Sequence, residues 1–353
     1  MARKRVTLAD VAAAAGVSSP TASLVLAGRG AELRISAAVR RRVREVAEEL
    51  GYRPNIVSVG LRKGSSRTLG FVSDTVATSQ LAGDLIKGAL EGALARGYML
   101  FIGETEGDPD VERRLLETMA DRQVDGIVLA SMYTQDRPLP AGLDQVPVVL
   151  LNALGAVPLG APPTVVPAAV AAGRAAARLL VDAGHRRIHL VGAGPGPDDY
   201  PPGTVAGRER LAGILDVLGS EGIAPASGVI SADWLPELGW EAARRILADD
   251  GPGRAMIAFN DRVGFGAHQA TQAAGLSIPR DLSIVSFDDH PLAGWLRPGL
   301  TTFALPHYDL GRRAVEILLD CVTDPGSEAT RPGTVHRIPM PLRLRDSVAP
   351  ALP

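Results

Sequence analysis

The first 52 residues carry apolar side chains at helical spacing, interrupted by a glycine and by capping residues. The pattern predicts a helix over residues 8–15 that Thr7 caps and Gly16 ends. Ser18 is the expected cap of a second helix, in which Pro20 lies near the start, where its missing N–H has little effect. Two short helices around a glycine-containing turn are typical of a helix-turn-helix motif.

A third helix and a linker follow. Ser36 is the expected cap of a helix that runs to about Leu50, and its single apolar stripe can close a three-helix core. Residues 1–52 are therefore predicted to form a headpiece. Residues 53–67 are a short apolar segment with basic residues at its end and then Gly and Ser, a pattern that on its own is compatible with an ordinary linker.

From Thr68 onward, continuous apolar runs of strand length alternate with amphipathic helices. This alternation predicts parallel sheets that are covered by helices on both faces. There are too many units for one sheet, and 353 residues are too many for one core. We therefore predict an α/β domain over residues 68–345, with two similar doubly wound lobes that begin near residues 68 and 164, and a tail over 346–353.

Charge is distributed unevenly between these parts. Residues 1–67 hold thirteen Lys or Arg and five Asp or Glu, a net charge of +8, although the whole chain has a net charge of −2. The rest of the chain is therefore acidic, with a net charge of −10. A basic head on an acidic body indicates that the head binds a polyanion.

Other features narrow the class of protein. The single Cys321 excludes an internal disulfide framework and fits a reducing compartment. No run approaches the ~18 uninterrupted apolar residues of a membrane span, so we expect a cytoplasmic protein without a membrane anchor. The sequence shows no metal-ligand spacing and no nucleophile with a credible base, and we expect neither a cofactor nor a catalytic site.

Four polar residues directly follow apolar strands or lie one position beyond them. The carboxyl ends of parallel strands are where side chains reach a ligand-binding cleft. Carboxylates and amides at such positions suit a ligand rich in hydroxyl groups. The four residues are Asp74, Asn152, Asn260 and Asp288. For Asp74 and Asn260, helix capping is as good an interpretation as ligand binding. For Asp288, ligand binding is the better interpretation.

Longer motifs resemble one family. The N-terminal run VTLADVAAAAGVSSPTASLVLAG, followed by ISAAVRRRVREVAEELGYRPN, is similar to the headpiece of the lactose-repressor (LacI/GalR) family of bacterial transcription regulators. The similarity continues through AFNDRVGFGAHQA and IVSFDDHPLAGWLRPGLTTF, so it covers nearly the whole chain. It implies a regulator with a periplasmic-binding-protein-like body whose two lobes enclose an effector.

The resemblance also assigns the C-terminal segments. It implies that the helix PHYDLGRRAVEILLDC returns to lobe one and that the strand VHRIPMPLRLR returns to lobe two. Lobe one would then comprise about 68–163 plus 304–322, and lobe two about 164–290 plus 334–345. The chain would cross between the lobes three times. Two further effector contacts follow from the resemblance, Arg208 at the start of a helix and Trp234 as a wall for a sugar.

DNA contacts are expected in two places. We expect base contacts from Ser19, Pro20 and Leu24 of the second helix and phosphate contacts from Ser18, Thr21 and Ser23 of the same region and from Thr7 at the start of the first helix. Because Pro20 and Leu24 are apolar, base readout should depend on thymine methyl groups and DNA shape. The resemblance implies a hinge helix in 53–67 that inserts Leu61 into the minor groove, with Asn55 and Ser58 as further DNA contacts.

The expected partners are operator DNA, a small-molecule effector and a second copy of the chain. The hypothesis is a repressor that binds a palindromic operator as a homodimer, with a tetramer as the alternative assembly. The effector is sugar-like or a related polyol, although the segment DTVATSQLAGDLIKG lacks the aromatic pair that the family often has there. Two other classes stay open: a small-molecule-binding protein of periplasmic type without DNA-dependent function, and an enzyme on two Rossmann-like lobes.

Overall fold

The computed structural model describes residues 6–53, 64–79, 82–140, 142–143, 146–155, 161–248 and 254–351. It divides into two compact units, Met1–Ser66 and Arg67–Pro353. Each unit is described by itself.

The N-terminal unit contains three helices: α1 (Leu8–Ala15), α2 (Ser19–Leu26) and α3 (Ala37–Glu49). Their first turns are capped by Thr7, Ser18 and Ser36, as predicted. Gly16 ends α1 with φ 68°, a left-handed conformation that glycine adopts without steric cost. Apolar side chains from all three helices meet in one core: Val11, Ala12, Ala15, Ala22, Val25, Val43 and Ala47.

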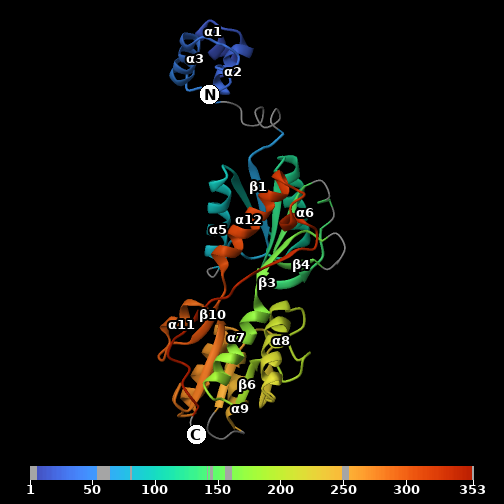
Figure 1. Ribbon diagram of the computed structural model, residues 1–353, viewed down its shortest axis with the longest axis vertical. Helices are drawn as coiled ribbons and strands as arrows, with labels where there is room; N and C mark the ends of the chain where they lie inside the picture. Colours follow the sequence, from blue (N-terminus) through green and yellow to red (C-terminus); the bar gives the residue numbers. More distant parts are fainter. Residues whose placement is uncertain are drawn as a thin grey trace. The chain divides into compact units, whose positions relative to one another are not determined.

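The larger unit contains two six-stranded sheets, each with helices on both faces (Figure 1). The first sheet has the order β11-β5-β4-β3-β1-β2. Its strands are β1 (Thr68–Ser73), β2 (Met99–Glu104), β3 (Gly126–Arg137), β4 (Val148–Gly155), β5 (Thr164–Pro167) and β11 (Val335–Ile338). Its helices are α5 (Gly83–Ala95), α6 (Pro109–Asp121) and α12 (His307–Thr323), with a short 3₁₀ turn at Glu328–Thr330. These elements form the first lobe.

The second sheet has the order β12-β10-β9-β8-β6-β7. Its strands are β6 (Arg187–Gly192), β7 (Ser227–Ile230), β8 (Arg254–Ala258), β9 (Leu282–Asp288), β10 (Thr301–Ala304) and β12 (Leu342–Arg343). Its helices are α7 (Ala169–Asp182), α8 (Val205–Ser220), α9 (Pro236–Ala248), α10 (Asp261–Ala273) and α11 (Pro291–Trp295). These elements form the second lobe.

Both sheets are parallel except at β12, which pairs antiparallel with β10. Successive strand residues face opposite sides, so β1 sends Leu69 and Phe71 to the core under α5 and α12 and Val72 to the core under α6. In the second lobe, α7 and α8 cover one face and α9 and α10 the other. The predicted fold class, a helical headpiece plus two doubly wound lobes, is confirmed.

The chain passes between the lobes three times, as expected: after β5, after β10 and between β11 and β12. The predicted lobe boundaries were wrong at two places. Residues 164–167 form β5 of the first sheet and do not open the second lobe. The segment VHRIPMPLRLR is divided, because β11 pairs with β5 in the first lobe and only β12 joins the second.

No single helix in the described ranges has the length and apolar character needed to cross a membrane; only α1 and α2 taken together, bent by 103°, meet that criterion.

Candidate functional site

A cavity of about 1020 Å³ lies between the two lobes. The first lobe contributes the ends of β3 and β4, and the second contributes α8, the loop before α9 and the loop after β9. All three crossing segments also line it, through Pro167, Leu305 and Pro341 among others. A ligand in this cavity would therefore touch both lobes and the segments that join them.

The cavity contains a buried ion pair between Arg210 of α8 and Asp288 at the end of β9. Arg210 Nη2 lies 2.9 Å from Asp288 Oδ1, and only 3% of the arginine side chain is exposed. Nη1 donates to the carbonyl oxygen of Phe259. The guanidinium carbon lies 4.7 Å from the ring centre of Phe287 and 5.5 Å from that of Trp234. Nε is buried and has no hydrogen-bond partner among the described residues.

Trp234 and Asn260 are fixed against each other in the second lobe. Trp234 Nε1 donates to the carbonyl oxygen of Gly192 at 3.2 Å. Asn260 Oδ1 accepts the N–H of Val263 at 2.8 Å and so caps α10, while Nδ2 donates to the carbonyl oxygen of Trp234. The capping interpretation of Asn260 is confirmed; the residue also lines the cavity, and its contact with a ligand stays a prediction.

Asn152 faces the cavity from the first lobe. It is 2% exposed and has φ 55°, in the left-handed region that asparagine tolerates better than most residues. Its Oδ1 accepts the hydroxyl of Thr134 at 3.4 Å. Thr134 and Gln135 of β3 line the same wall, so the first lobe offers neutral polar groups to a ligand.

His307 begins α12 beside the cavity. Its Nδ1 is buried without a hydrogen-bond partner among the described residues. Burial lowers the pKa of His307, against the opposing effect of the Asp288 and Asp84 carboxylates. Burial thus favours the neutral imidazole at this edge of the cavity.

Two predicted effector residues lie outside the cavity. Asp74 Oδ1 accepts the N–H groups of Thr75 and Met132, at 2.6 and 2.9 Å, and ties the end of β1 to β3. Arg208 does not point into the cavity but pairs with Asp136 of the first lobe at 3.5 Å. The physical reason is helical geometry, since positions 208 and 210 differ by about 200° around the axis.

Arg210 was missed from the sequence, although a signal was present. It lies within the apolar stripe of α8 that includes Ala206, Leu211 and Ile214, all of them buried. A charged residue inside a buried stripe must have a partner in the protein interior. That stripe, rather than position at the helix start, identifies the arginine that reaches the cavity.

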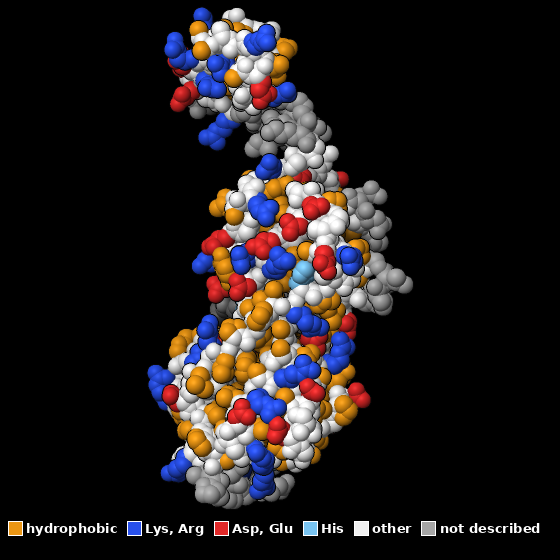
Figure 2. Space-filling model, in the orientation of Figure 1, with side chains coloured by type: hydrophobic (Ala, Val, Ile, Leu, Met, Phe, Trp, Pro, Cys, Tyr) orange, Lys and Arg blue, Asp and Glu red, His pale blue; other side chains and the backbone are white. Residues whose placement is uncertain are grey.

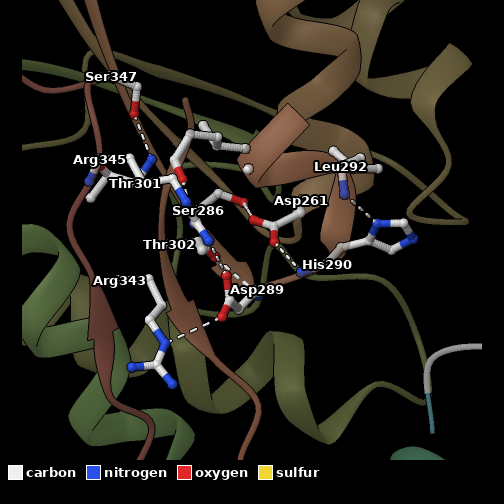
Figure 3. Close-up of polar contacts among 12 residues, drawn as sticks. Asp261, Ser286, Asp289, His290, Leu292, Thr301, Thr302, Arg343, Arg345 and Ser347 are labelled. Carbon is white, nitrogen blue, oxygen red and sulfur yellow. Dashed lines mark hydrogen bonds and ion pairs between the residues drawn. The ribbon is translucent and has the colours of Figure 1, made fainter. Parts of the chain in front are cut away.

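The loop after β9 is held in an unusual conformation. Asp288 has φ 111° and Asp289 has φ 56°, and each non-glycine residue in this region costs on the order of 1–3 kcal/mol. Asp289 Oδ1 lies 2.5 Å from Arg345 Nη2, and Oδ2 lies 3.3 Å from Arg343 Nε (Figure 3). These pairs attach the loop to the segment that follows the third crossing.

Asp261 is a buried carboxyl group behind this loop. It is fully buried, and it accepts the hydroxyl of Ser286 at 2.6 Å and the N–H of His290 at 2.7 Å (Figure 3). Burial, followed by repulsion from the Asp288 carboxylate, raises the pKa of Asp261 to about 7. Its charge state therefore changes near neutral pH.

The headpiece has an exposed second helix. Ser18, Ser19 and Pro20 are exposed, and Thr21, Ser23 and Leu24 are half-buried. The Ser18 hydroxyl caps α2 and lies 2.8 Å from that of Thr21. Thr7 caps α1, forming a reciprocal pair of hydrogen bonds with Asp10. Several Arg side chains are distributed over the visible face of this unit, among uncharged and a few acidic groups (Figure 2). The predicted hinge residues Asn55, Ser58 and Leu61 lie outside the described residues.

Comparison with known proteins finds a family match for the headpiece and another for the larger unit. Residues 7–55 match the family described as bacterial regulatory proteins, lacI family, and residues 177–348 match the periplasmic binding protein-like domain. The chain is 30% identical over 328 residues to the HTH-type transcriptional repressor PurR of Salmonella paratyphi B (strain ATCC BAA-1250 / SPB7), covering 92% of each protein. The chain belongs to the LacI family of bacterial regulatory proteins.

Other relatives agree with this assignment. The ribose operon repressor of Escherichia coli (strain K12) is 29% identical over 92% of this chain and 96% of its own length. The lac repressor dimer bound to operator and the anti-inducer ONPF has a TM-score of 0.77 at 25% identity, covering 98% of this chain and 100% of that chain. A complex of the transcriptional regulator CelR with cellobiose has a TM-score of 0.66 at 28% identity, with coverages of 97% and 100%.

Family membership settles the class of protein. This LacI-family protein is a DNA-binding transcription regulator with an effector domain, and the family is not generally enzymatic. Among the described residues, no group of three or more His, Cys, Asp or Glu could hold a metal ion.

Proposed function

We propose that this regulator is a repressor whose operator affinity is set by a sugar-like ligand in the inter-lobe cavity. The observation that carries the proposal is that both lobes and all three crossing segments line one cavity. A ligand that contacts both lobes favours one arrangement of the lobes by its differential affinity. The headpiece on the same chain would then respond through the spacing of two subunits on DNA.

The cavity supports a polyol or sugar as the effector. The partly exposed carboxylate of Asp288 offers an acceptor for hydroxyl groups, and Asn152 offers an amide from the opposite lobe. Trp234 adds an apolar wall of the kind that packs against a sugar ring. The volume of about 1020 Å³ fits a small ligand.

A thermal-shift screen of the full chain tests this part of the proposal. Pentoses, hexoses, disaccharides, polyols and nucleobases would be compared, since a ligand that binds the native state raises its melting temperature. We expect a hit among the sugars or polyols. The same compound should change the affinity of the protein for an operator that is selected from random duplexes. A hit confined to nucleobases would contradict the polyol assignment, and a hit without any effect on DNA binding would contradict the switch.

Operator recognition is proposed to use the exposed residues of α2. Ser19, Pro20 and Leu24 present hydroxyl and apolar groups, which suit thymine methyl groups better than guanine edges. Selection from random duplexes should yield two inverted half-sites. Replacing the half-site thymines by uracil removes only the methyl groups and should weaken binding about tenfold. Replacing guanine by 7-deazaguanine is the matched control and should have little effect; the reverse result would contradict apolar readout.

The hinge segment is proposed to contribute a minor-groove wedge. Leu61 is the candidate wedge, with Asn55 and Ser58 beside it as DNA contacts, by the family resemblance of the sequence. Leu61→Ala should weaken binding to the selected operator more than binding to unrelated duplex of the same length, because wedge insertion depends on a bent site. Equal loss on both duplexes would contradict the wedge role.

Homodimerisation is proposed to use the exposed apolar side chains of α5 and β2. Leu94 is 74% exposed and Met99 63%, and Leu90 and Phe101 are also exposed. β2 is the edge strand of the first sheet, so the patch lies where a second copy can pack by twofold symmetry. Leu94→Glu should shift the protein from dimer to monomer in sedimentation velocity and weaken operator binding. The assignment would be contradicted if the wild-type protein were a monomer. It would also be contradicted if the wild-type protein were a tetramer that Leu94→Glu left intact.

A further inference from the structure

The first turns of α8 are attached to both lobes. α8 belongs to the second lobe, yet three successive residues near its start have partners in three different places. Arg208 pairs with the first lobe, Glu209 pairs with the first lobe at another strand, and Arg210 pairs inside the cavity. Successive residues of a helix point about 100° apart, which is why three neighbours can reach three partners.

The pair between Glu209 and Arg337 is the stronger attachment. Both carboxylate oxygens of Glu209 accept from the guanidinium of Arg337, each at 2.8 Å. The residue Glu209 is only 8% exposed, whereas 40% of the Arg337 side chain is exposed, so the strength of this partly buried pair comes mainly from its bidentate geometry. Arg337 lies on β11, just before the third crossing, so the pair joins the lobes close to their connection.

The pair between Arg208 and Asp136 is a second attachment at a separate strand. Asp136 lies at the end of β3, which β4 and β5 separate from β11 in the first sheet. The charged atoms are 3.5 Å apart, and about half of each side chain is exposed. Alone, such a pair would contribute little. Together with the bidentate pair it provides a second point of contact, and two points resist rotation where one would allow it.

We infer that Arg208 and Glu209, with Asp136 and Arg337, form a clasp that holds the two lobes in one arrangement. In this role they are positioning residues, because they orient α8 without touching the ligand. Arg210 is the next residue along, so whatever binds Arg210 acts on a helix that is fixed to both lobes. The clasp itself needs no ligand; only its coupling to an effector rests on the proposed function.

The distance between the lobes tests the clasp directly. Spin labels would be placed at Arg122→Cys in the first lobe and Glu241→Cys in the second, both exposed, in a Cys321→Ser background that removes the natural thiol. Labelled chains are diluted with unlabelled chains before assembly, so that distances within one chain dominate. Pulsed electron resonance then gives the inter-lobe distance distribution of the full-length protein without ligand.

We expect the double substitution Arg208→Ala with Glu209→Ala to broaden that distribution about twofold, because both attachments are lost. The matched control is Asp216→Asn, which removes an ion pair of the same helix with Arg174 of α7, wholly within the second lobe. The control should leave the distribution unchanged. Asp136→Asn alone, at an exposed position that tolerates change, should give a smaller broadening.

The inference would be overturned if the double variant and the Asp216→Asn control gave the same distribution while both kept the wild-type melting temperature within a few degrees. If the double variant were too unstable to measure, the Asp136→Asn variant would test the clasp, since that substitution removes only an exposed pair. A distribution as narrow as that of the wild type would then overturn the inference. A failed ligand screen would contradict the effector switch but would leave the distance result, and therefore the clasp, unaffected.

Discussion

Arg210 and Asp288 are buried together at the cavity, and each would be unstable there alone. An unpaired buried guanidinium is strongly unfavourable, and Asp288 supplies the opposite charge while its remaining oxygen stays available to a ligand. The two stacked rings of Phe287 and Trp234 hold the guanidinium in place. This arrangement presents a preorganised acceptor, the second carboxylate oxygen of Asp288, to the cavity before any ligand arrives.

Asp288→Asn should therefore weaken ligand binding while keeping the shape of the site. The amide still accepts from Arg210 but loses the charge that strengthens a hydrogen bond to a ligand hydroxyl, so we expect a loss of about 10- to 100-fold in affinity. Isothermal titration with the compound from the screen measures it. Asp281→Asn is the control, because Asp281 pairs with exposed Arg280 outside the cavity. Unchanged affinity in Asp288→Asn would exclude Asp288 from the ligand contacts.

Asp261 makes the stability of the protein depend on pH. Its folded pKa of about 7 lies above the ordinary value of 3.8, so between these values the folded state holds a proton that the unfolded state has released. The stabilisation is complete below about pH 4 and is lost as pH rises through about 7. The total effect is on the order of a few kcal/mol.

Asp261→Asn should remove this dependence. Asparagine can still accept the N–H of His290 and can donate to Ser286, so the hydrogen bonds survive without a titrating group. Urea unfolding at pH 5, 6, 7 and 8 should show the wild type losing stability relative to the variant as pH rises. Histidines with lowered pKa, such as His189 at about 4, act in the opposite direction in both proteins and cancel in the difference. Parallel curves for the two proteins would contradict the prediction.

The sequence was sufficient to predict the cavity residues that are placed by the end of a strand. It was not sufficient for the residue that is placed by the rotation of a helix about its axis. Asn152, Asn260 and Asp288 line the cavity because each lies near or just beyond the carboxyl end of a strand that opens on it, and Trp234, which the family resemblance implied, lines it as well. Asp74 also follows a strand, but its carboxylate is occupied by two backbone N–H groups. The prediction for Arg208 failed for another reason. Arg208 and Arg210 point in different directions around α8, and this difference decides which arginine enters the cavity. The position of a strand carries no information about the direction in which a helical residue points.

At the level of elements, helix pairs approach each other closely through facing glycines. A Cβ on Gly88 of α5 would lie 2.0 Å from the carbonyl oxygen of Tyr308, and one on Gly311 of α12 would lie 1.9 Å from that of Leu85. The two helices therefore pack backbone against backbone. The same arrangement recurs between α7 and α8 at Gly173 and Gly213, and between α9 and α10 at Gly239 and Gly266.

Gly311→Ala should push α5 and α12 apart and destabilise the first lobe. The added methyl group meets backbone, which cannot rotate away, so we expect a loss of about 1–3 kcal/mol in the free energy of unfolding. Gly219→Ala in α8 is the matched control, because nothing lies within 4 Å of its added Cβ. There the helix propensity of alanine should leave stability unchanged or raise it by up to about 1 kcal/mol. Urea denaturation compares them; equal effects would contradict close helix packing.

The long elements were predictable and the short ones were not. The capping residues and the helical periodicity predicted α1 at Leu8–Ala15, and a run of apolar residues predicted β1 at Thr68–Ser73. β5 and β10, four residues each, have too few positions for a period to be visible, and they were missed. VHRIPMPLRLR looked like one strand because the change of sheet between β11 and β12 is decided by tertiary pairing.

For the whole molecule, the division between the two units coincides with the change in charge. The basic N-terminal segment ends where the first strand of the acidic body begins, and the structure separates Met1–Ser66 from Arg67–Pro353 at the same point. Affinity for DNA and its dependence on salt should therefore belong to the first unit. The cavity and every residue that lines it belong to the second.

A fragment of residues 67–353 should consequently fold, bind the sugar identified by the screen as tightly as the full chain, and lose DNA binding. Its two lobes have their own cores, and the described residues that line the cavity all belong to this fragment. Titration calorimetry and a DNA-binding assay at several salt concentrations measure both properties. Sugar binding that is retained shows only that the body is autonomous, which a periplasmic-type binding protein would share. The decisive comparison is in the full chain, where the sugar must change operator affinity; if it does not, the headpiece and the cavity are independent and the binding-protein hypothesis is the better one.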